Sequence, residues 1–185
     1  MKKIGLQLFV SMFVMLFLFQ LAAVAQDKPA PSPLGKVYQR VGVTDVEITY
    51  SRPNVKGRAI FAEDGLTPLG KLWRTGANAA TKISFSTDVK VNGTDVKAGE
   101  YAIFSIPGAE EWTLILNSEM EQRGTSKYDE AKDAARFTVK PSEFPFIVET
   151  FTIILHNVTD TSTDVGIYWE KTAVSFTVEV EKTWE

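Results

Sequence analysis

The chain has 185 residues, of which 20 are basic, 23 acidic and one is histidine, giving a formal charge of −3 near neutral pH. This mildly acidic balance argues against a general nucleic-acid binder and against binding to anionic membranes. The absence of cysteine excludes disulfides, thiolate metal sites and cysteine nucleophiles.

The segment from Met1 to Ala25 has the pattern of a secretory signal peptide. Lys2 and Lys3 precede an almost continuous apolar run from position 4 to position 21, and small alanines at 23 and 25 supply the cleavage motif. An uncleaved membrane anchor is the alternative, because the apolar run approaches the roughly 20 residues that span a bilayer. Cleavage would remove both lysines and no acidic residue, so the formal charge would become −5. We therefore expect export to the periplasm or the cell exterior, with no stable transmembrane segment after cleavage.

After the leader, the sequence is typical of a small β-protein. Residues 26–34 contain three prolines and suggest an extended linker, and residues 35–185 suggest one β-rich domain. Apolar and polar residues alternate through Val46, Ile48 and Tyr50, and Asn92-Gly93 is a strong hairpin signal. Further strands are expected near residues 83–85, 89–91, 101–106, 112–116, 148–155, 166–169 and 174–180. The segment 148–155 is nearly all β-branched or aromatic, which favours a central strand.

A helical pattern is found only over residues 127–135, where Tyr128, Ala131 and Ala135 share a face. The expected fold is therefore all-β, an antiparallel β-sandwich or barrel-like domain with at most one short helix.

Two segments concentrate polar chemistry beside glycine and proline. The first, residues 50–61, reads YSRPNVKGRAIF, and the second, residues 72–81, reads LWRTGANAAT. A loop without clean periodicity joins them, and loops of this length in compact domains are usually functional or disordered. The candidate ligand-binding residues are Arg52, Lys56, Arg58, Trp73, Arg74 and Asn78. We expect all of them except Trp73 to converge at one place.

Guanidinium groups bind carboxylates and phosphates through paired hydrogen bonds, so these cations suit an anionic or carbohydrate ligand, with Trp73 available for stacking. The alternative is structural, with each cation paired to acidic residues such as Glu47, Glu63, Asp64 or Asp88, or bound to loop carbonyls. The sequence leaves both open.

The two segments also carry a family resemblance. They are followed by Phe85-Ser86 and Asp88-Val89, by Gly99-x-Tyr101, by WTLILN at residues 112–117 and by Trp169-Glu170-Lys171. Together these motifs resemble a bacterial family known as domain of unknown function 2911 (DUF2911), common in the Bacteroidetes. The resemblance covers essentially all of the chain after the leader. It implies export and a β-rich domain but no activity, cofactor or substrate.

Catalytic and metal chemistry have little support. Ser51 and Lys56 suggest a serine–lysine pair only if burial lowers the lysine pKa, and the lone His156 ends an apolar strand. Asp129, Glu130 and Asp133 lack the spacing of a calcium loop, so we expect no metal and no cofactor. The favoured function is an exported binding module. A hydrolase-type enzyme using the same patch and a structural component of the cell envelope are the alternatives.

Overall fold

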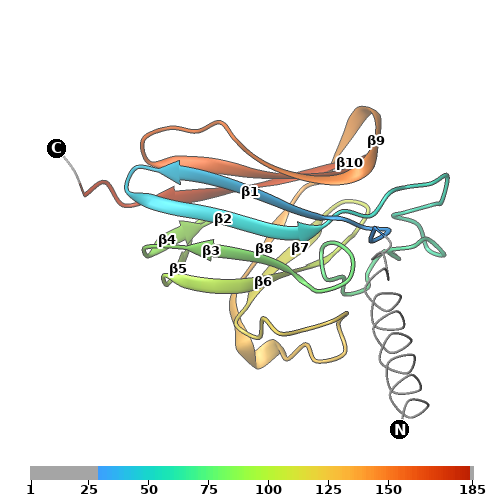
Figure 1. Cartoon of the computed structure of the whole chain (residues 1–185), viewed down its shortest axis with the longest axis horizontal. Helices are drawn as coiled ribbons and strands as arrows, with labels where there is room; N and C mark the ends of the chain where they lie inside the picture. Colours follow the sequence, from blue (N-terminus) through green and yellow to red (C-terminus); the bar gives the residue numbers. More distant parts are fainter. Residues whose placement is uncertain (1–28, 184–185) are drawn as a thin grey trace, which may run out of the picture. The chain divides into compact units, whose positions relative to one another are not determined.

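The computed structural model describes residues 29–183, which form two antiparallel sheets packed face to face (Figure 1). One sheet has six strands in the order β1-β2-β3-β6-β7-β8, and the other has four in the order β5-β4-β10-β9. The strands are β1 (Leu34–Val41), β2 (Thr44–Ser51), β3 (Thr81–Phe85), β4 (Val89–Val91), β5 (Thr94–Val96), β6 (Gly99–Ile106), β7 (Trp112–Asn117), β8 (Asp133–Val139), β9 (Ser142–His156) and β10 (Ser162–Val180). The predicted all-β sandwich is confirmed.

The predicted signal peptide, residues 1–25, lies outside the described residues. Within residues 29–183, no helix is long and apolar enough to cross a membrane.

The main core lies between the two sheets and is built by alternation along each strand. In β2, Val46, Ile48 and Tyr50 are buried, whereas the residues between them are only half-buried. Because successive side chains of a strand point to opposite faces, this period of two places one apolar face against the opposing sheet. The same logic holds in β10, where Phe176 and Val178 are buried.

A second, smaller core covers the outer face of the six-stranded sheet. Ala102 and Phe104 of β6 pack there with Ile115 of β7, and Tyr128 lies against them. Tyr128 donates a hydrogen bond to the Asp133 carboxylate at 2.8 Å, and burial together with this bond raises the pKa of the tyrosine to about 12. Tyr128 therefore holds the segment between β7 and β8 against the outer face of the six-stranded sheet.

The helix predicted over residues 127–135 is mostly absent. One 3-10 turn, η1 (Glu130–Lys132), follows an Asp129 side chain that accepts a hydrogen bond from the Ala131 amide. Strand β8 then begins at Asp133 and buries Ala135 against the core. The spacing of Ala131 and Ala135 matches one face of a helix, but residues 133–139 pair with β7 and therefore form a strand.

The hairpin predicted at Asn92-Gly93 is confirmed. Both residues have positive φ, 48° and 84°, and they join β4 to β5. Positive φ at both turn positions matches the right-handed twist of the paired strands, and asparagine and glycine adopt it at low cost.

Strand β10 turns back on itself near Glu170, whose φ is 55°. The Val180 amide donates to the Thr161 carbonyl at 2.8 Å, and the Thr177 hydroxyl donates to Asp164 at 2.7 Å. A straight strand would separate two residues 13 positions apart by about 43 Å. The two strands predicted at residues 166–169 and 174–180 are thus the two halves of β10, which lie side by side on either side of the turn at Glu170.

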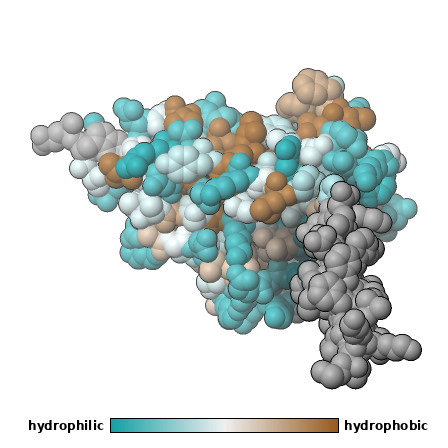
Figure 2. Space-filling model, viewed as in Figure 1, coloured by the Kyte–Doolittle hydropathy of each residue, from teal (hydrophilic) through white to brown (hydrophobic). Residues whose placement is uncertain are grey.

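Strand β9 lies at the edge of its sheet, so the prediction that residues 148–155 form a central strand is wrong. Its pairing with β10 shifts in register between Val148 and Glu143, so residues 144–147 have no paired residue in β10. Phe146 and Ile147 in this irregular stretch of the strand are 63% and 56% exposed. Figure 2 shows hydrophobic surface where β9 turns.

Candidate functional site

The first cation-bearing segment leaves the six-stranded sheet and covers the free edge of β9. Asn54 forms an antiparallel bridge with Thr150. The Val55 amide donates to the Glu149 carbonyl at 2.8 Å, and the Phe151 amide donates to the Pro53 carbonyl at 2.8 Å. Residues 53–55 thus pair with the backbone groups at the outer edge of β9. An apolar edge strand covered in this way is protected from pairing with other chains.

Two side chains extend this edge contact. The buried Tyr50 hydroxyl accepts a hydrogen bond from the Ile153 amide at 3.0 Å and donates to the Ile153 carbonyl at 3.2 Å. Arg52 donates from Nε to the Phe151 carbonyl at 3.1 Å and from a terminal nitrogen to the Thr152 hydroxyl at 3.0 Å. Arg52 therefore satisfies backbone and hydroxyl acceptors of β9, as the structural alternative predicts.

Lys56 and Arg58 lie on the exposed loop that follows. The Lys56 amide donates to the Glu149 carboxylate at 2.9 Å, and Lys56 adopts a positive φ of 50°. Arg58 donates to the carbonyls of Val55 and Asn54 and so braces its own turn. Both residues are exposed, but the hydrogen bonds of Arg58 are internal to the loop.

Trp73 is buried, with only 8% of its surface exposed. Its ring stacks on Trp169, with centroids 5.7 Å apart and planes 17° from parallel, and contacts Phe151 edge-on at 5.4 Å. The indole Nε1 donates to the Gly76 carbonyl at 3.0 Å. Trp73 is part of an aromatic cluster in the core, which also contains Phe61 and Trp112.

Arg74 differs from the other predicted cations. Its Nε is buried, and within residues 29–183 neither this nitrogen nor the rest of the guanidinium has a hydrogen bond or an ion pair. Burial, followed by repulsion from Arg123, lowers the pKa of Arg74. The two terminal nitrogens of Arg74 are not among the buried atoms, so the end of the side chain reaches the surface. No described residue accepts a hydrogen bond from them.

Asn78 is exposed and has a φ of 59°, a left-handed conformation that asparagine tolerates. Its amide donates to the Ser51 hydroxyl and to the Ser32 carbonyl, each at 3.3 Å. The Arg52 amide donates to the neighbouring Pro33 carbonyl at 2.9 Å. Asn78 and Arg52 therefore fasten the segment that enters β1.

The predicted residues come together only in part. Asn78 and Arg52 meet around Ser51, and Arg74 lies on the same loop as Asn78. Within residues 29–183, no hydrogen bond or ion pair joins any two of the four predicted cations, or joins one of their side chains to a carboxylate. The loop carbonyls, rather than Glu47, Glu63, Asp64 or Asp88, are the partners of Arg58.

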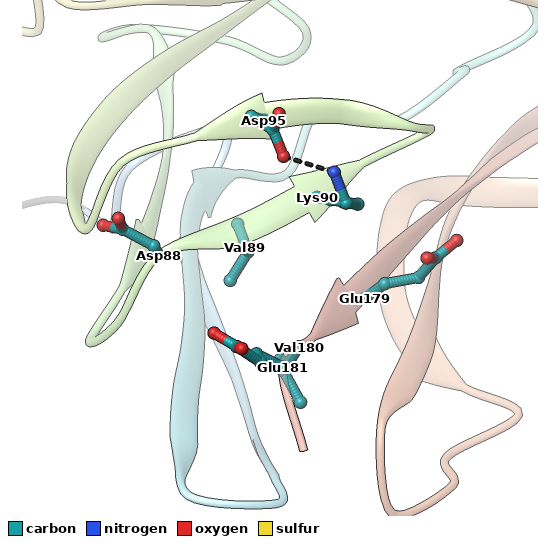
Figure 3. A pocket seen from close by; sticks show the side chains of 7 residues that line it. All are labelled: Asp88, Val89, Lys90, Asp95, Glu179, Val180 and Glu181. Carbon is teal, nitrogen blue, oxygen red and sulfur yellow. Dashed lines mark hydrogen bonds and ion pairs between the residues drawn. The ribbon is translucent and has the colours of Figure 1, made fainter. Parts of the chain in front are cut away.

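Three described cavities lie away from these residues. The first, of about 350 Å³, lies between the β4–β5 hairpin and the end of β10 (Figure 3). Its carboxylates do not converge: Asp95 binds Lys90, Asp88 binds Lys97, and Glu179 and Glu181 point to opposite sides (Figure 3). The second is lined by Arg40, Val43 and Asp160 among others, and the third lies on the outer face of β2 and β3.

The proposed serine–lysine pair has no support in the geometry. The Ser51 hydroxyl accepts its bond from Asn78, and no contact with Lys56 is found in the part of the chain that the structure describes. His156 pairs with Asp164 across β9 and β10, and its Nε2 is buried without a partner among the described residues. No group of three metal-binding side chains is found within residues 29–183.

Sequence reasoning missed Arg123 and Gln122, in the segment between β7 and η1. Gln122 is buried at 4% exposure, and its Oε1 has no partner in the described part of the chain. Ala79 forms an antiparallel bridge with Arg123, so this segment lies beside the Arg74 loop. No local motif marks either residue, and their distance from Arg74 along the sequence hides the contact.

The fold and this surface define a small all-β sandwich domain. One of its loops carries a partly buried arginine whose side chain has no partner among residues 29–183. The chain belongs to a family described as protein of unknown function (DUF2911), whose sequence model matches residues 32–178. No curated protein and no solved structure matches it.

Proposed function

We propose that the protein is an exported binding module that recognises an anionic group through Arg74. The observation that carries the proposal is the guanidinium of Arg74, which is partly withdrawn from water without a carboxylate partner among the described residues. Burying a charge without a partner is unfavourable, and buried arginines are normally paired. An anionic ligand would supply the missing counter-charge.

The other predicted residues support this function indirectly. Arg52, Arg58 and Asn78 are engaged by the protein and hold the loops in place. The burial of Trp73 leaves the carbohydrate alternative without the aromatic side chain chosen for stacking. An anionic ligand is therefore the better supported of the two chemistries.

Substituting Arg74 by methionine should separate binding from folding. Without ligand, we expect the stability of Arg74→Met to hold or rise, because a desolvated charge beside Arg123 is removed. Wild-type protein should gain about 1.4 kcal/mol at an anion concentration ten times Kd, and the variant should lose this gain. Thermal unfolding with and without sodium phosphate, at constant ionic strength, measures both effects.

Arg58→Met is the matched control. It removes an equal charge and the bonds to the Val55 and Asn54 carbonyls, so it should lower stability while leaving the phosphate effect intact. If Arg74→Met strongly destabilises the ligand-free protein, or leaves the phosphate effect unchanged, Arg74 is a structural residue and the proposal is wrong.

Export is part of the proposal and rests on the basic start, the apolar run and the small-residue motif between Met1 and Ala25. Protein recovered from the native host should begin at Gln26, because signal peptidase would cleave after Ala25. Intact-mass spectrometry of the soluble and membrane fractions tests this. An uncleaved chain beginning at Met1 in the membrane fraction would support the anchor alternative.

A further inference from the structure

Arg74 and Arg123 come from distant parts of the sequence, but the backbone of each pairs with a residue of the short segment 79–81. The Thr81 amide donates to the Arg74 carbonyl at 3.2 Å, and Ala79 pairs with Arg123. Between them, the Ala80 amide donates to the Gln122 carbonyl at 3.1 Å. The two arginines are thereby held beside each other, which agrees with their mutual repulsion.

The acidic residues near Arg123 already have other partners. Glu121 pairs with Lys82 at 2.7 Å, and Glu119 pairs with Lys132. Farther along the same segment, both Glu130 and Asp133 pair with Arg136, and Asp129 accepts from the Ala131 amide.

The two arginines differ from these acidic residues. Arg123 is exposed, and neither it nor Arg74 has a side-chain hydrogen bond or ion pair within residues 29–183. The carboxylates of the segment bind elsewhere, whereas the two guanidinium groups have no hydrogen-bond or ion-pair partner in the part of the chain that the structure describes. Because their backbone segments pair with each other, a partly buried and an exposed positive charge are left in one region of the surface.

We propose that Arg74 and Arg123 form one surface site for a tetrahedral dianionic group, a phosphate monoester. The inference rests on the proposed function and adds the second arginine and the charge of the ligand. A dianion neutralises both guanidinium charges and offers several oxygens, so each arginine can form its own charge-assisted hydrogen bonds. A monocarboxylate would neutralise only one charge.

Titration calorimetry with three probes, sodium phosphate, sodium sulfate and sodium acetate, tests the inference at constant ionic strength. In wild-type protein, phosphate and sulfate should bind at least fivefold more tightly than acetate. In Arg123→Gln, this preference should disappear, whereas weak binding through Arg74 remains. Lys140→Gln removes an equal charge from an exposed position without an ion pair among the described residues and should change nothing.

The pH dependence separates the two dianions. Inorganic phosphate gains its second negative charge near neutral pH, whereas inorganic sulfate stays dianionic and arginine stays charged. Phosphate affinity should therefore rise several-fold from about pH 5 to pH 8, and sulfate affinity should stay constant. If phosphate affinity does not rise with pH, the site does not select the dianionic form and the inference is wrong.

Two results would overturn the inference in different ways. If acetate binds as tightly as phosphate and Arg123→Gln has no effect, while Arg74→Met abolishes binding, the dianion site is wrong and the anion-binding function stands. If no probe binds wild-type protein, both proposals fail.

Discussion

Replacing Trp73 by alanine should lower the free energy of unfolding by about 3–5 kcal/mol, the usual cost of removing a large buried aromatic side chain. The substitution would leave a cavity beside Trp169 and Phe151 and would remove the indole donor to the Gly76 carbonyl. The buried carbonyl would then lack its partner, which adds to the loss. Denaturant unfolding, followed by tryptophan fluorescence, measures the change in the midpoint.

Phe146→Ala is the control, because Phe146 is an aromatic residue on the surface, 63% exposed. Its substitution should change stability by less than about 0.5 kcal/mol, as expected for surface positions. Trp73→Ala could instead lower the free energy of unfolding as little as Phe146→Ala and abolish the binding of a sugar. Trp73 would then not be a core residue, and the hypothesis that it stacks on a ligand would be supported.

Tyr50→Phe should cost about 2–4 kcal/mol although it removes a single oxygen atom. The Tyr50 hydroxyl serves both the amide and the carbonyl of Ile153, and an unsatisfied buried group costs about 1–3 kcal/mol. The ring would still fill its place against Phe151, so the loss reports the hydrogen bonds alone. Chemical unfolding gives the energy, and hydrogen exchange of the Ile153 amide gives the location.

The matched control is Tyr38→Phe. Tyr38 is 55% exposed, and its hydroxyl donates to Asp45 at 2.7 Å on the surface. Water replaces this bond, so the cost should stay below about 1 kcal/mol. Equal effects of the two substitutions, or unchanged protection of the Ile153 amide in Tyr50→Phe, would mean that Tyr50 does not hold the edge of β9.

The sequence was a good guide to features that depend on neighbours in the chain. Alternation in β2 and the Asn92-Gly93 turn are local signals, and both predicted elements are present. The helical pattern over residues 127–135 failed because β7 offers β8 a pairing partner, which local propensity does not include. Strand β1 has exposed residues at alternate positions and gave only a weak signal.

In the candidate site, too, contacts between residues close in sequence could be predicted, whereas contacts between distant residues could not. The loop carbonyls that bind Arg58 are three and four residues away, so the structural role of Arg58 is local. Arg52, in contrast, binds Phe151, 99 residues later in the chain. Arg123 lies beside Arg74 only because the segment between β7 and η1 crosses the sheet. Such contacts depend on topology, and the spacing of residue types along the sequence does not reveal them.

The contact between β2 and β9 also constrains the order in which the protein can fold. Tyr50 and Ile153 are 103 residues apart, whereas β1 and β2 pair through a short turn. During synthesis, β1, β2 and β3 emerge long before β9 and β10, so much of the six-stranded sheet can assemble before the β9 and β10 part of the other sheet is available. Because closing such a long loop costs entropy before any contact forms, the seam between the sheets should form late and fold slowly. Until then, the apolar inner face of the six-stranded sheet lacks the strands that cover it in the folded protein, which makes the incomplete chain prone to aggregation.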